Sequence, residues 1–85
     1  MQQEIFPREV TSNVPRLTLT GQERLLVEQH RGLENCTASE IGLRTGCGLL
    51  KVAGRGLLFL RYTPSEALIT GKIESILYAV DGRNG

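Results

Sequence analysis

The sequence is poor in aromatic side chains and in net charge. Its 85 residues include no tryptophan, two tyrosines and two phenylalanines. Glycan-binding modules usually present exposed aromatic rings, so this shortage argues against glycan recognition. Ten basic and nine acidic residues give a formal charge of +1. Such a balance creates no field that would attract a phosphate backbone or an anionic membrane, and we therefore expect no nucleic-acid partner.

Residues for catalysis or metal binding are also scarce. His30 is the only histidine, and Cys36 and Cys47 lie far apart without a C-x-x-C pair. A catalytic triad or a zinc site needs more ligands at closer spacing. We predict that the protein is not an enzyme and holds no metal or cofactor. His30 beside Arg31 is interpreted as an exposed turn histidine, and the cysteines as small, at least partly buried hydrophobes.

Long hydrophobic runs are missing as well. No uninterrupted aliphatic or aromatic run exceeds five residues, whereas a spanning helix needs about 20 apolar residues. The N-terminus lacks the basic region followed by an apolar one that marks a secretory signal. We therefore expect neither a visible export signal nor direct membrane insertion.

The sequence contains many short apolar runs, and ten glycines are distributed along it. This pattern predicts an all-β domain built of strands and turns. Pro15 suits the start of a first strand, so we assign residues 1–13 to an N-terminal arm, 14–80 to the domain and 81–85 to a polar tail. Seven short strands are predicted, over residues 17–20, 25–27, 41–44, 49–53, 57–62, 67–73 and 76–80.

A faint repeat of apolar residues around glycines allows two architectures. Rungs of a short β-solenoid would repeat in this way, and so would the hairpins of a small antiparallel β-sandwich, which we favour. Side chains two apart on a strand line one face of a sheet. Leu50, Val52, Leu58 and Leu60 share one parity and are predicted to face the core together.

The strands over 57–60 and 76–78 carry apolar residues at both parities. Because only one face of each sheet in a sandwich meets the core, the others need a different cover. The arm, a loop or local bulging is one explanation. The other is a partner surface containing Leu57, Phe59 and Leu77, used for self-association or for docking on another protein.

A second functional hypothesis is a regulatory β-module that binds a small molecule or glycan in a cleft between loops. Its polar contacts would be His30, Arg31 and Arg55, which lie in or beside glycine-containing turns. The shortage of aromatic residues weighs against it.

Several segments together resemble the YabP/YqfC family of sporulation proteins. They are residues 15–21 (PRLTLTG), 26–33 (LVEQHRGL), 40–43 (EIGL), 48–54 (GLLKVAG) and 69–76 (ITGKIESI). The turn that contains His30, Arg31 and Gly32 is most similar to the YqfC branch. Residues 34–39 depart from the expected pattern, which is more apolar.

The resemblance implies an immunoglobulin-like β-domain made in the mother cell of an endospore-forming bacterium. It also implies a role in assembly of the spore envelope or coat, with no catalytic residues. Such proteins are typically encoded beside a membrane protein of the same programme. We therefore expect a homo-oligomer, a complex with that membrane protein, or both. The expected location is the mother-cell cytoplasm, peripheral to the outer forespore membrane, where reducing conditions would keep the thiols free.

Overall fold

The computed structural model describes residues 14–79, which form six strands and no helix. The strands are β1 (Arg16–Thr20), β2 (Arg24–Glu28), β3 (Gly32–Cys36), β4 (Glu40–Thr45), β5 (Gly48–Tyr62) and β6 (Glu66–Ala79). The predicted all-β class is confirmed. The arm assigned to 1–13 and the tail assigned to 81–85 lie outside the described residues.

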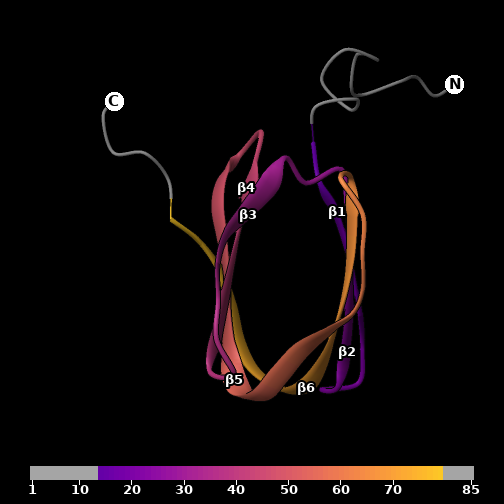
Figure 1. Ribbon diagram of the computed structural model, residues 1–85, viewed down its shortest axis with the longest axis vertical. Helices are drawn as coiled ribbons and strands as arrows, with labels where there is room; N and C mark the ends of the chain where they lie inside the picture. Colours follow the sequence, from indigo (N-terminus) through magenta and orange to yellow (C-terminus); the bar gives the residue numbers. More distant parts are fainter. Residues whose placement is uncertain (1–13, 80–85) are drawn as a thin grey trace, which may run out of the picture.

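All six strands belong to one antiparallel sheet with the order β1-β2-β6-β5-β4-β3. Its two central strands, β5 and β6, are far longer than the others and bend sharply, so that the two halves of the sheet face each other as walls (Figure 1). The first wall contains β1, β2, residues 66–70 of β6 and residues 57–62 of β5. The second contains β3, β4, residues 48–53 of β5 and residues 73–79 of β6.

The bend, which we call the crease, depends on two glycines. A Cβ atom on Gly54 would collide with the backbone carbonyl of Lys72. Gly71 has φ +126°, and a Cβ atom there would lie 2.9 Å from the Cα of Leu57. Because glycine lacks this atom, the two strands can cross at a distance that no other residue allows. Register shifts on either side of Arg55 add further bending.

The crease changes the predicted strand count. The predicted strands 49–53 and 57–62 lie within β5, and 67–73 and 76–79 lie within β6. Residue 80, the last of the predicted strand 76–80, is outside the described residues. The glycines between them bend a continuous strand and do not end it. No predicted strand covers β3. Neither two separate sheets nor the rungs of a solenoid describe this molecule, because the described strands form a single antiparallel sheet.

The crease also reverses which residues of β5 face the core. Leu50 and Val52 are fully buried, whereas Leu58 is 51% exposed and Leu60 is 53% exposed. The prediction that these four residues share a face is therefore wrong. The register shifts between Ala53 and Leu58 interrupt the alternation, and Leu57 turns inward in their place.

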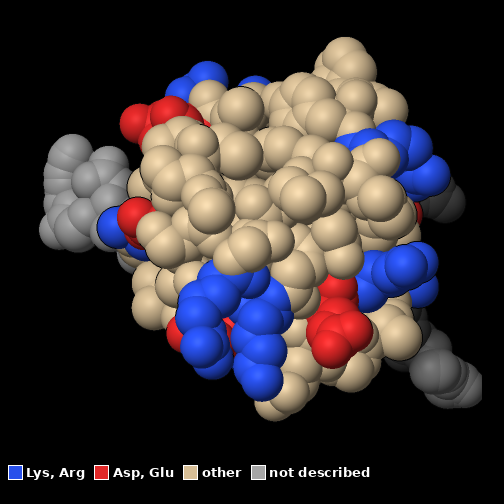
Figure 2. Space-filling model, turned by 60° about the horizontal axis from the view of Figure 1, so that its bottom comes forward, with Lys and Arg blue, Asp and Glu red and all other residues tan. Residues whose placement is uncertain are grey.

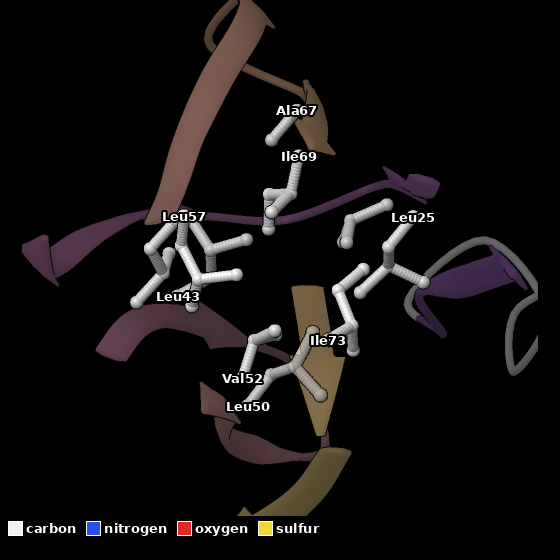
Figure 3. Packing of buried hydrophobic residues seen from close by; sticks show 10 residues of the cluster. Leu25, Leu43, Leu50, Val52, Leu57, Ala67, Ile69 and Ile73 are labelled. Carbon is white, nitrogen blue, oxygen red and sulfur yellow. The ribbon is translucent and has the colours of Figure 1, made fainter. Parts of the chain in front are cut away.

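The core lies between the two walls. Figure 3 shows Leu57 beside Leu43, with Leu25 and Ile73 pointing into the same interior from other strands. The buried cluster comprises Leu25, Val27, Ile41, Leu43, Leu50, Val52, Leu57, Ala67, Ile69 and Ile73. Burying each large aliphatic side chain stabilises the fold by roughly 1.5 to 3 kcal/mol.

Residues 29–31 connect the walls at the end opposite the crease. The backbone N–H groups of Gln29 and His30 both donate to the carbonyl of Ser65, at 2.7 and 3.1 Å. Ser65 lies in the turn between β5 and β6. The N–H of Arg31 donates to the carbonyl of Arg44 in β4, at 2.7 Å. The linker therefore ties the first wall to the second.

We predict that Gly54→Ala destabilises the protein more than Gly56→Ala, although only Gly56 has a positive φ (+61°). An added Cβ at Gly56 meets nothing within 4 Å, so only backbone strain of about 1 kcal/mol is expected. At Gly54 the methyl group forces the strands apart, at roughly 2 to 3 kcal/mol. Urea unfolding measures both losses. Equal losses in the two variants would contradict the steric role assigned to the crease.

Candidate functional site

An apolar patch covers part of the outer face of the first wall. Leu26 of β2 lies directly opposite Leu68 of β6, and each alternates with buried residues along its strand. Both side chains therefore point away from the core. Leu58 and Leu60 of β5 are the exposed leucines of the neighbouring strand. We call Leu26, Leu58, Leu60 and Leu68 the outer patch.

Charged side chains border the outer patch. Arg61, opposite Leu68, forms an exposed ion pair with Glu66 at 3.4 Å. Arg24 lies opposite Thr70, the residue that pairs with Leu58. Exposed pairs of this kind add little stability. The molecule also has a broad uncharged area on the face seen from the crease side, with charged groups mainly toward its border (Figure 2).

The three residues of the predicted partner surface, Leu57, Phe59 and Leu77, do not form one surface. Leu57 is only 4% exposed and belongs to the core, so its assignment to a surface is wrong. Phe59 is half-buried against the same core. Leu77 is 50% exposed but lies on the second wall, opposite Lys51. The bulges in β5, which no local sequence signal marks, exchange the inner and outer residues and reveal Leu58 and Leu60 instead.

His30 is buried, with 3% exposure, so the predicted exposed turn histidine is wrong. Its Nδ1 atom accepts a hydrogen bond from the N–H of Gly32, at 3.0 Å. The proton then resides on Nε2, which donates to the carbonyl of Thr63 at 2.9 Å. The ring also contacts Tyr62, with centroids 5.1 Å apart. His30 thus fastens the linker to the turn between β5 and β6.

The residues of the alternative ligand site do not converge. Both ring nitrogens of His30 already have partners. Arg55 lies at the crease and forms an ion pair with Glu74 at 2.8 Å, whereas His30 and Arg31 lie in the linker at the other end of the walls. A shallow, open depression of about 330 Å³ is lined by Glu34, Arg44, Thr45, Gly48, Leu49 and Ala79, none of which belongs to that set.

Cys36 and Cys47 are free thiols and both are exposed, contrary to the expected burial. One ends the outermost strand β3 and the other lies in the tight turn between β4 and β5, where the sheet offers no cover. Partial burial, and to a lesser extent the charge of Cys47, raises the pKa of Tyr78 above its usual range.

Residues 14–79 contain no group of three His, Cys, Asp or Glu side chains placed to hold a metal ion. The same residues include no helix with the length and apolar character needed to cross a membrane.

Comparison with known proteins identifies the family. The model of the YabP family matches residues 11–85. The chain belongs to the YabP family. It is 29% identical over 73 residues to the uncharacterized protein YqfC of Bacillus subtilis (strain 168), an alignment that covers 86% of this chain and 78% of that relative. No solved structure matches the chain. The family resemblance predicted from the sequence segments is confirmed.

We predict that His30→Ala lowers the free energy of unfolding by roughly 2 to 4 kcal/mol, because it opens a cavity and leaves buried backbone groups without a partner. His30→Gln, whose amide offers a donor and an acceptor, should recover part of the loss. Urea unfolding of the two variants and the parent protein measures the difference. A His30→Ala variant as stable as the parent would rule out the fastening role.

Proposed function

We propose that the chain is a non-enzymatic sporulation protein that acts in assembly of the spore envelope or coat by binding another protein at the outer forespore membrane. Two observations support the proposal. The chain belongs to the YabP family, and the resemblance described above links that family to sporulation. We assign the binding of the other protein to the outer patch, because it is an apolar surface on a wall whose strands are paired with one another.

The outer patch has the composition of a protein-binding surface. Leu58 and Leu60 each leave about half of their area in water, at 51% and 53% exposure. Soluble monomers seldom expose contiguous apolar patches without a use for them. Arg61 and Glu66 at the border supply the polar rim that surrounds the apolar centre of a typical interface.

The wall that carries the patch is already ordered. Leu26, Leu68 and Leu58 lie on strands whose backbones are paired within the sheet. Binding there requires little ordering of the backbone, so more of the gain from apolar burial appears as affinity. We propose that the occupant is the cytoplasmic part of a sporulation membrane protein encoded nearby, which presents an apolar surface with polar groups at its border.

The test replaces the chromosomal gene with a Leu58→Glu, Leu60→Glu variant and counts heat-resistant spores. Glutamate at these positions places charge in the centre of the interface, so we expect a large loss of spores and of co-purification with the membrane protein. The matched control is Leu19→Glu, because Leu19 on β1 is 49% exposed but lies outside the patch. Phe59 is a poor probe, since its substitution would disturb the core.

Circular dichroism and urea unfolding of the purified variants must show that both keep the fold. Normal sporulation of the folded double variant would refute the role of the outer patch. An equal defect in the Leu19→Glu control would show that added charge on the sheet, and not the patch, causes the loss.

A further inference from the structure

Within residues 14–79, each of the two long strands has one half with an unpaired edge. Strand β2 pairs only with residues 66–70 of β6, so that residues 75–79 have β5 as their sole partner among the described strands. Strand β4 pairs only with residues 48–53 of β5, which leaves the outer side of 58–62 open. The outer sides of β1 and β3 are the ends of the sheet.

Three of these four edges carry features that hinder pairing with another strand. Strand β3 has a bulge at Glu34, whose carboxylate is held by Arg44 at 2.6 Å. The edge of β5 is interrupted by register shifts and carries Arg61. Strand β1 is five residues long and starts with Arg16 directly after Pro15. Bulges, charges, proline and short length are the usual means by which proteins protect an edge.

The edge of β6 has none of the bulges, charges or prolines of the other edges, although at five residues it is as short as β1. Residues 75–79 (SILYA) include no charge and no proline, and their pairing with β5 is regular from Ser75 opposite Ala53 to Ala79 opposite Leu49. Leu77 is 50% exposed and Tyr78 is 38% exposed. A regular, uncharged and apolar edge is a template for a further strand.

We propose that this edge pairs with the same edge of a second copy of the chain, antiparallel, with the two-fold axis at Leu77. Residues directly opposite each other in an antiparallel pair must lie on the same face of the sheet. Leu77 then meets its own counterpart on the outer face, and Ser75 meets Ala79. On the inner face Ile76 meets Tyr78. No like charges oppose each other, so the edge is complementary to itself.

The register with its axis at Ile76 is less favourable. An axis at Ile76 places Glu74 opposite Tyr78 and Ser75 opposite Leu77. The axis at Leu77 instead joins the exposed leucines, each 50% exposed in the single chain, and places Glu74 outside the regularly paired segment 75–79. Cross-strand apolar pairs of this kind each contribute a few tenths of a kcal/mol up to about 1 kcal/mol.

The paired edges would join the second walls of two copies into one continuous sheet. The outer patch lies on the first wall and stays accessible in both copies. The dimer would therefore present two patches, and a partner with two matching sites would be held more tightly by avidity. The dimer itself rests on the edge of β6 and does not depend on the proposed function.

The first test measures solution mass by light scattering over a concentration series for the full chain, Leu77→Lys and Leu77→Glu. The parent chain is expected to dimerise. Each variant places like charges opposite each other at the axis, so the dissociation constant should rise by roughly tenfold or more. An equimolar mixture of the two variants should restore the dimer, because lysine then faces glutamate.

Leu60→Lys is the matched control, since Leu60 is 53% exposed but lies on the first wall. It should leave the dimer intact. A parent chain that is monomeric throughout, a dimer unaffected by Leu77→Lys, or a mixture that fails to reassociate would overturn the proposal. Dissociation by Leu60→Lys would assign self-association to the outer patch and also overturn it. Leu77→Lys that is monomeric yet still binds the membrane protein would separate the two proposals.

The second test fixes the register. In a chain with Cys36→Ser and Cys47→Ser, Leu77→Cys should form a disulfide-linked dimer on mild oxidation, because facing residues of an antiparallel pair lie about 4.5 to 5.5 Å apart between Cα atoms. Leu60→Cys in the same background should form little disulfide-linked dimer. Equal cross-linking of both, or none at residue 77, would exclude an axis at Leu77.

Discussion

The close crossing of β5 and β6 at the crease is the constraint on which the rest of the structure depends. The carbonyl of Lys72 occupies the space where a side chain of residue 54 would begin. Only with glycine there can one sheet bend until its two inner faces meet. That meeting creates the core, since each wall alone would leave its inner leucines, isoleucines and valines in water.

The same constraint decides what the surface offers. Bulges that accompany the crease shift the alternation of β5, so Leu57 enters the core while Leu58 and Leu60 leave it. The exposure of the two β5 leucines in the outer patch is therefore a geometric consequence of bending the sheet. At the opposite end, the linker with His30 ties the walls together through bonds to Thr63 and Ser65 on one side and to Arg44 on the other.

The sequence was sufficient to predict the all-β class, most strand positions and the family, because these depend on local apolar patterns and on short segments in order. It could not predict the strand count, since a glycine such as Gly54 gives the same sequence pattern whether it ends a strand or permits two strands to cross closely. Strand β3 was missed because its bulge interrupts the alternation after Leu33. The burial of His30 could not be predicted, because its hydrogen-bond partner Thr63 lies 33 residues away in the sequence.

A sheet that bends across its two longest strands also creates free edges. Strands β2 and β4 are short and pair with only one half of β6 and β5, respectively, so each long strand extends past its outer neighbour. In β5 the bulges and Arg61 disturb the edge that results. In β6 the half with the open edge is regular from Ser75 to Ala79 and carries no charge. Because an edge of this kind is open to aggregation unless something covers it, its lack of protection is best explained by a specific strand partner.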